Sequence, residues 1–417
     1  MSQIIDDDTR AALDVQDERL IRPHGVREQL AAARSRVSKG DLGSLPVIIG
    51  LAVIWVVFQL MNPFFLSSAN LVNLALECAA IGTIAIGVVL VLLVAQIDLS
   101  IGSISGVAAA IFAVGFTQLG WPLWFGVLVG IVAGGVIGWV YGLVYARFGV
   151  PTFVITLAGL MGVLGLQLAI LGTNGSINIP FDTWLVNFAS QTFVPPVVSY
   201  ALVVFAVALY GGSAYLYARR RAAAGLSAAP TSTIAAKAIA LLVALGVTSW
   251  YLNRDRGVSV MFLLFVVFVV ITNYALIHTR WGRSVYAVGG SVEAARRAGI
   301  NVNRIFISCL VLGATFAAIG GVFSAARLAS AGVSSGGADT NLMAIAAAVI
   351  GGTGLFGGRG NAWSALLGIV VIQSISNGLT LLSLDTSVRY MVTGAVLLLA
   401  VVIDSLSRRS RAMHGQA

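Results

Sequence analysis

Few polar side chains in this chain could act on a small solute, and most of them stand beside long apolar runs. Asp98 and Ser100 lie in segment 97–102, which reads Ile-Asp-Leu-Ser-Ile-Gly and directly follows one such run. A carboxylate at the centre of a membrane helix costs about 2.5–3.5 kcal/mol, so it needs a partner, a cavity or a structural role. If a helix begins here, both side chains can cap it, with the carboxylate near its positive end. We expect this structural cap, and an ion-coupling carboxylate is the alternative.

A second pair of polar residues, Thr173 and Asn174, follows the apolar run 151–172. Hydroxyl and amide groups suit a neutral polyol, so these residues could contact a sugar at the mouth of a pathway. Turn chemistry explains the same residues, because short polar side chains stabilise tight turns. Both interpretations stay open at this point.

A charged island at 289–300 separates two long hydrophobic runs and reads Gly-Gly-Ser-Val-Glu-Ala-Ala-Arg-Arg-Ala-Gly-Ile. Small residues allow the surface of a partner to approach closely. The flanking charges determine how the polar rims of the two surfaces align. We therefore hypothesise a docking loop for a soluble partner, and an ordinary solvated loop is the alternative. The residues of this hypothesis are Gly290, Glu293, Ala294, Ala295, Arg296 and Gly299.

Covalent, metal and nucleotide chemistry find little support. The glycine-rich segment 351–360 lacks the Gly-Lys-Ser/Thr of a phosphate-binding loop, and Lys39 and Lys237 are the only lysines. Cys78 and Cys309 lie in apolar runs without neighbouring metal-ligand residues, so we interpret them as small buried hydrophobes. We expect no catalytic residue, metal or cofactor, and the energy for any work must come from a partner or an ion gradient.

The composition, 58% hydrophobic and 10% charged, indicates a polytopic membrane protein. Crossing about 30 Å of hydrocarbon takes roughly 20 residues of helix. The sequence predicts an all-α transmembrane bundle of about 12 helices, some of them discontinuous around 74–117 and 340–383. The predicted runs are 46–62, 74–96, 98–117, 121–145, 151–172, 196–218, 235–252, 258–278, 305–327, 340–357, 362–383 and 387–406.

The basic residues stand at the ends of these runs, which is typical of topology determinants and not of a nucleic-acid surface. If the N-terminus is cytoplasmic, 21 of the 25 Lys and Arg residues fall on that side. The other four are Arg254, Arg256, Arg327 and Arg389. We expect a cytoplasmic arm at 1–45, a membrane domain at 46–406 with a cytoplasmic loop at 279–304, and a cytoplasmic tail at 407–417.

Three sequence segments, taken in their order along the chain, resemble one protein family. Segment 97–102 is similar to an Ile-Asp-Leu-Ser-x-Gly motif, and Glu-Ala-Ala at 293–295 resembles a coupling loop. Residues 343–353 read Met-Ala-Ile-Ala-Ala-Ala-Val-Ile-Gly-Gly-Thr, followed by Gly-Gly-Arg-Gly-Asn at 357–361. Together they resemble ABC-transporter permeases of the monosaccharide-import type, such as those for ribose and xylose. Asn-Leu-Met at 341–343 stands where many members have Glu-Leu-Asp. The additional apolar hairpin at 235–278 favours the xylose branch.

The resemblance implies a substrate pathway with Asp98, Ser100, Thr173, Asn174, Asn341 and Thr353 along it. It also implies a homodimer in the inner membrane, a cytoplasmic ATP-binding subunit, and a periplasmic or surface sugar-binding protein. Transport would proceed by alternating access. The alternative is an ion-coupled secondary transporter of a small polar solute that works through Asp98. An intramembrane enzyme is disfavoured, because His24, His278 and His414 lie in or beside segments expected in the cytoplasm.

Overall fold

A computed structural model describes residues 45–224, 226, 228–388, 390–396, 398 and 402. The predicted arm at 1–45, apart from its last residue, and the tail at 407–417 lie outside the described residues. The described chain divides into two compact units. The larger unit comprises residues 45–193 and 259–402, and the hairpin unit comprises residues 194–258.

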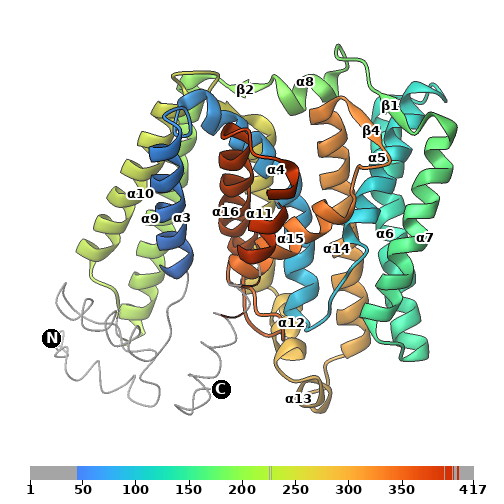
Figure 1. The fold of residues 1–417 in the computed structure, drawn as a ribbon. Helices are drawn as coiled ribbons and strands as arrows, with labels where there is room; N and C mark the ends of the chain where they lie inside the picture. The colour runs from blue at the N-terminus through green and yellow to red at the C-terminus, as the bar shows by residue number, and fades with distance from the viewer. Residues whose placement is uncertain are drawn as a thin grey trace, which may run out of the picture. The chain divides into compact units, whose positions relative to one another are not determined.

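The larger unit is almost entirely helical (Figure 1). Its helices are α3 (Leu45–Met61), α4 (Ser68–Leu93), α5 (Ile101–Thr117), α6 (Leu123–Phe148), α7 (Thr152–Leu171), α8 (Trp184–Ser190), α11 (Val260–His278), α12 (Arg280–Gly290), α13 (Val292–Arg297), α14 (Val302–Leu328), α15 (Ala338–Ile350) and α16 (Trp363–Leu381). Residues 386–388 and 390–396 are also helical. A 3₁₀ turn, η1 (Gly172–Asn174), follows α7. Strand β1 (Ser176–Asn178) pairs antiparallel with β4 (Ser330–Gly332).

Helices α4 and α14 form the centre of the larger unit. In α4, 89% of the most apolar window is buried inside the protein, and in α14 the share is 61%. The two helices approach closely at Gly87 and Gly313, where a Cβ on Gly87 would come within 2.4 Å of the Gly313 carbonyl oxygen. Small residues at such crossings let helix backbones meet, which is how helices commonly pack in membranes.

Eight described helices are long and apolar enough to cross a membrane: α4, α6, α7 with η1, α9 (Pro196–Ala223), α10 (Thr231–Leu252), α11, α14 and α16. Three shorter apolar helices, α3, α5 and α15, coincide with further predicted runs. The all-α membrane bundle expected from the sequence is thus confirmed. The last predicted run, 387–406, lies partly outside the described residues.

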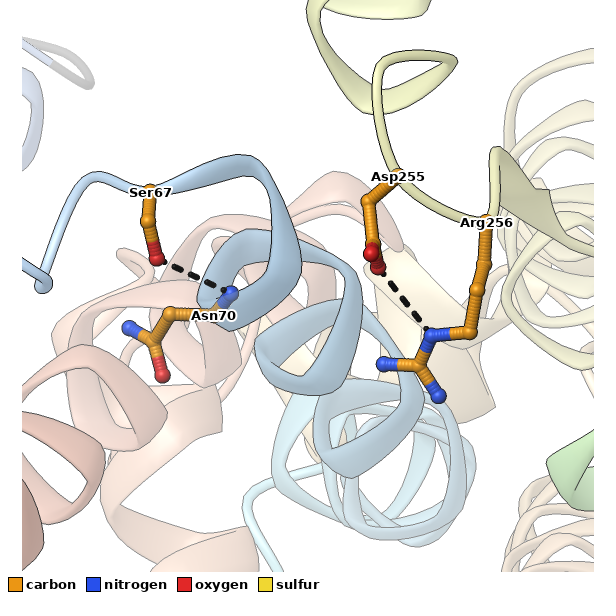
Figure 2. A network of polar contacts seen from close by, with 4 residues as sticks. All are labelled: Ser67, Asn70, Asp255 and Arg256. Atoms are coloured by element: carbon orange, nitrogen blue, oxygen red, sulfur yellow. Dashed lines mark hydrogen bonds and ion pairs between the residues drawn. The ribbon is translucent and has the colours of Figure 1, made fainter.

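Helix ends explain where the predicted boundaries were wrong. α4 begins at residue 68 and not at 74, because Ser67 caps it by accepting a hydrogen bond from the Asn70 amide (3.3 Å; Figure 2). The run 340–357 is not one helix. α15 stops at Ile350, and several of the glycines that follow adopt positive φ angles that helices exclude.

The hairpin unit consists of α9 and α10. Only 11% of the apolar window of α9 and 6% of that of α10 are buried. After α10, Arg256 pairs with Asp255 across 3.1 Å (Figure 2). Both side chains are partly exposed, so this ion pair adds little stability. Strands β2 (Phe193–Val194) and β3 (Val258–Ser259) pair where the chain enters and leaves the hairpin.

Candidate functional site

Two interruptions of the helical pattern meet inside the larger unit. The first is segment 94–100 between α4 and α5, and the second is the turn at 332–337 that precedes α15. The Asn341 side-chain amide donates to the Leu99 carbonyl oxygen (2.9 Å). The turn presses on α5, because a Cβ on Gly102 would lie 2.8 Å from the Gly336 carbonyl oxygen. Asn341 therefore lies beside the segment of Asp98, although 242 residues separate it from Leu99.

Asp98 is buried and holds the start of α5. Its Oδ1 accepts from the Ser100 backbone N–H (2.8 Å) and from the Ser100 hydroxyl (2.7 Å). Ser100 occupies the N-cap position of α5, but its side chain makes no capping hydrogen bond there. The expectation that both residues cap the helix is therefore wrong for Ser100, whose hydroxyl is taken by Asp98. Among the described residues, the other carboxylate oxygen, Oδ2, has no hydrogen-bond partner.

Helix α7 supplies further polar groups that hold these segments in place. The Thr156 hydroxyl accepts from the Leu99 N–H (3.1 Å), and the Thr152 hydroxyl donates to Gln96 Oε1 (2.5 Å). The Gln167 side chain is fully buried and donates to the carbonyl oxygens of Gly332 and Ser335, both at 2.9 Å. The sequence interpretation missed these α7 residues. Their signal was available, because a polar residue inside an apolar run usually has a specific partner.

The remaining predicted pathway residues do not join this cluster. Thr173 and Asn174 are exposed in η1, beyond the end of α7, whereas Thr156 lies in the first turns of that helix. A rise of 1.5 Å per residue puts about 25 Å between the two places. Thr353 is buried in the glycine-rich segment 351–360, where a Cβ on Gly360 would lie 2.9 Å from its hydroxyl. The structure thus brings together only Asp98, Ser100 and Asn341.

The predicted docking loop is a pair of short helices at one end of the larger unit, opposite β1, β4 and α8 (Figure 1). Ser291 caps α13 by accepting from the Ala294 N–H (3.2 Å). Gly299, with φ of 79°, ends α13, and the N–H groups of Gly299 and Ile300 donate to the carbonyls of Arg296 and Ala295. This C-terminal pattern needs a left-handed residue, so Gly299 has a structural role inside the chain.

One residue of the predicted docking surface is buried in the structure. Gly290, Glu293, Ala294 and Arg296 are exposed, as a docking surface requires. Ala295 is 2% exposed and packs inside the chain, so its assignment to the partner interface is wrong. A helix turns about 100° per residue, so Ala294 can face solvent while the adjacent Ala295 faces the protein. Glu293 and Arg296 lie 3.8 Å apart at the surface.

Helix α12 connects this surface to the end of α4 and to the glycine-rich segment 351–360. A Cβ on Gly289 would lie 1.8 Å from the Leu93 carbonyl oxygen and 2.6 Å from the Gly358 nitrogen. The Gly358 N–H donates to the same Leu93 carbonyl (2.9 Å), and the Tyr286 hydroxyl donates to the Gly360 carbonyl (2.8 Å). We call the contact of Leu93, Gly289 and Gly358 the glycine junction. It joins α12 and α13 to the end of α4, which leads to Asp98, and to the segment after α15.

This arrangement is suited to binding a polar solute and to movement of the interrupted segments. Buried hydroxyl, amide and carboxylate groups can exchange hydrogen bonds with a polar solute, and interrupted helices expose backbone groups for the same purpose. The glycine junction packs α12 against the end of α4, which leads to Asp98, and against the segment that follows α15.

Comparison with known proteins shows the family to which the chain belongs. A family described as "Branched-chain amino acid transport system / permease component" matches residues 70–401. The chain is 36% identical over 346 residues to the xylose transport system permease protein XylH of Escherichia coli (strain K12), covering 83% of this chain and 87% of that protein. It is 30% identical over 379 residues to the ribose import permease protein RbsC of Bacillus subtilis (strain 168), covering 90% and 98%. No solved structure matches the chain.

Proposed function

We propose that this chain, which belongs to the ABC-transporter permease family of the xylose and ribose permeases, is the membrane-spanning subunit of an ATP-driven monosaccharide importer. The transported sugar is a pentose such as xylose. Two copies form the pathway in the inner membrane, with both termini in the cytoplasm. A cytoplasmic ATP-binding subunit docks on α12 and α13, and a periplasmic or surface sugar-binding protein delivers the substrate.

The observation that supports this proposal is the series of close contacts that links α13, through Gly289 of α12, to the segments of the proposed substrate pathway. Glu293, Ala294 and Arg296 present an exposed surface, and Gly289 lies against Leu93 and Gly358. A displacement of α13 by a closing ATPase must therefore move the end of α4 and the segment after α15, because close-packed backbones transmit displacement. Alternating access then follows from rearrangement of the interrupted segments around Asp98 and Asn341.

The choice of a pentose rests on two supports. The relative with 36% identity over 346 residues is named a xylose permease. The groups that meet at the interrupted segments include the Ser100 and Thr156 hydroxyls and the Asn341 amide. Such neutral groups match the hydroxyls of a sugar.

The experiment is co-purification combined with uptake. The permease is expressed with its candidate ATP-binding subunit and binding protein in cells that lack other xylose carriers, and accumulation of labelled xylose is measured. We expect the ATPase to co-purify, and a variant ATPase without its phosphate-binding lysine to stop accumulation. Retained accumulation with the disabled ATPase would refute ATP-driven transport.

One observation favours a second function, an ion-coupled secondary transporter. Asp98 is buried, forms no ion pair with a described residue, and has an oxygen without a hydrogen-bond partner among them. A membrane-embedded carboxylate of this kind can carry a proton. In that case, uptake would persist without the ATPase and would collapse when a protonophore removes the proton gradient.

A further inference from the structure

Glu77 is a carboxylate inside α4, and the pathway residues described so far do not include it. It stands nine positions after Ser68, the first residue of the helix, and sixteen positions before Leu93, the last. At a rise of 1.5 Å per residue, these separations are about 14 Å and about 24 Å along the axis. Since the hydrocarbon core is about 30 Å thick, Glu77 lies at membrane depth, in the half of α4 that is remote from the glycine junction.

An ionisable side chain at this depth requires polar surroundings. Such residues almost always face the bundle interior or a water-filled cavity, and they mark the paths of solutes and ions. The Gln373 side chain, on α16, donates from Nε2 to Glu77 Oε2 (3.2 Å). Gln373 is 7% exposed, whereas Glu77 is partly exposed. The pair therefore has a buried member and a member that a solute can reach.

The exposure of α4 decreases from its start toward the glycine junction. Asn73, Glu77 and Ile81 are not buried and stand four positions apart, so they share one face of the helix. Asn73 is exposed, Glu77 and Ile81 are partly exposed, and every later residue of α4 is buried. Because lipid is an unsuitable neighbour for a carboxylate, this face indicates a water-filled recess that narrows beyond Glu77.

A second polar pair on the same two helices shows what a purely structural contact looks like. The Asn70 amide donates to Asn377 Oδ1 (2.8 Å) and to the Phe65 carbonyl oxygen (2.7 Å). Asn70 is 8% exposed and Asn377 is 9% exposed. The Gln373 amide differs, because its Oε1 is buried and has no hydrogen-bond partner among the described residues. A hydroxyl group that enters beside Glu77 would supply the donor that this oxygen lacks.

The chemistry of the pair suits a neutral polyol. A carboxylate offers about four acceptor sites, so Glu77 can bind a ligand in addition to its neighbours in the protein. Hydrogen bonds from hydroxyl groups to a carboxylate are charge-assisted and roughly twice as strong as neutral ones. The Gln373 amide fixes the carboxylate, which gives the acceptors a defined direction.

We propose that Glu77 binds hydroxyl groups of the transported sugar in a recess on the side of the membrane opposite α12 and α13. This proposal rests on the proposed function and adds a residue that determines its substrate specificity. Glu77 is the sugar contact, and Gln373 is a positioning residue. Because Glu77 lies about 24 Å before the end of α4, an entering sugar meets it before it reaches the segments of Asp98 and Asn341.

The test measures access to a cysteine one turn beyond Glu77. Ile81→Cys is made in the full-length permease without Cys78 and Cys309, and the protein in nanodiscs reacts with a charged, water-soluble methanethiosulfonate. Val132→Cys is the matched lipid-facing control, because Val132 is 53% exposed and stands nine positions after the first residue of α6. We expect Ile81→Cys to react about tenfold faster or more, since the thiolate forms in water, and we expect xylose to slow this reaction.

The role of Glu77 is read from the xylose concentration that halves the reaction rate of Ile81→Cys. Glu77→Gln should raise this concentration about tenfold, because a charge-assisted hydrogen bond becomes a neutral one. Glu77→Asp, which keeps the charge, should raise it less. Asn377→Ala should lower the melting temperature, because buried Asn70 loses its acceptor, and should shift the concentration less than about twofold. Glycine betaine, which has no hydroxyl group, should not protect the thiol.

Two results would overturn the proposal. Reaction of Ile81→Cys no faster than that of Val132→Cys would exclude a water-filled recess. An unchanged protecting concentration in Glu77→Gln, at a preserved melting temperature, would exclude the sugar contact. The assay contains no ATPase, so it is independent of the importer test. Protection by xylose without ATP-dependent uptake would refute the importer alone, and ATP-dependent uptake without protection would refute this site alone.

Discussion

The carboxylate of Asp98 lies where a helix begins inside the protein, and one of its two oxygens is used by Ser100. In this geometry Asp98 stabilises the start of α5 by accepting hydrogen bonds, and accepting them does not require a charged side chain. An amide oxygen can accept the same N–H and O–H bonds. The other oxygen, Oδ2, has no hydrogen-bond partner among the described residues and is the atom on which any additional task must depend.

At this scale we predict that Asp98→Asn keeps transport within about threefold of the parent, because the amide still accepts from Ser100. Asp98→Leu should lower expression or melting temperature, because a buried N–H and hydroxyl lose their acceptor at about 1–3 kcal/mol each. The measurement is labelled-sugar uptake at pH 6 and pH 8, normalised to the amount of protein in the membrane. A well-expressed Asn variant that transports nothing would assign Asp98 to ion coupling.

Glu293 provides a second prediction for a single residue. Its side chain is 72% exposed and lies 3.8 Å from Arg296, so the ion pair contributes little to the stability of the fold. We expect Glu293→Gln to keep both ATPase binding and uptake within about twofold, because a charge at a wet rim is screened. Binding of the ATPase to immobilised permease at low and high salt measures this. A tenfold loss would show that Glu293 forms a desolvated pair with the partner.

At the scale of elements, the glycine junction is where α12 touches the end of α4 and the segment after α15. Gly289 and Gly290 are adjacent and chemically identical, yet their surroundings differ. A Cβ on Gly289 would collide with Leu93, whereas one on Gly290 would meet no atom within 4 Å in the described part of the chain. This pair therefore offers a matched test of the junction.

We predict that Gly289→Ala lowers the melting temperature or uptake clearly, because overpacking at a rigid backbone contact costs about 1–3 kcal/mol. Gly290→Ala should stay close to the parent, since alanine even favours the helix. Thermal unfolding and uptake are compared for the two variants. Equal behaviour would mean that the contact at Gly289 carries neither stability nor coupling.

Elements also show what the sequence could and could not predict. Long apolar runs predicted the spans, because crossing a bilayer requires continuous helix. The predicted run 340–357 extended past the end of α15 at Ile350, although the sequence indicated a discontinuity around 340–383 and glycines follow Ile350 directly. The contact of Asn341 with Leu99 joins positions far apart in the chain, so local patterns carried no sign of it. The burial of Ala295 depended on helical phase, which an isolated tripeptide does not fix.

At the scale of the whole molecule, the larger unit has two distinct ends. α12 and α13 lie at one, and η1 with β1 and β4 lies at the other (Figure 1). The distribution of Lys and Arg leads us to place the first end in the cytoplasm. Docking of an ATPase requires this orientation.

The orientation is tested by labelling single cysteines in intact cells, in a background without Cys78 and Cys309, both of which are buried. Arg297→Cys and Asn174→Cys place thiols at exposed positions at the two ends. We expect an impermeant maleimide to label position 174 readily and position 297 only after the cells are broken open. The reverse pattern would invert the topology and remove the docking surface from the cytoplasm.

The central claim is that the α13 surface couples an ATPase to transport, and Ala294→Trp tests it most directly. Ala294 is exposed, so the larger side chain should leave folding intact while preventing close approach of the partner. Ala222→Trp, at an exposed alanine near the end of α9, is the control. ATPase retention by the purified permease and sugar uptake are measured together. We predict that Ala294→Trp loses both, whereas the control keeps both. A permease with Trp at position 294 that still holds its ATPase and transports at the parental rate would contradict the account.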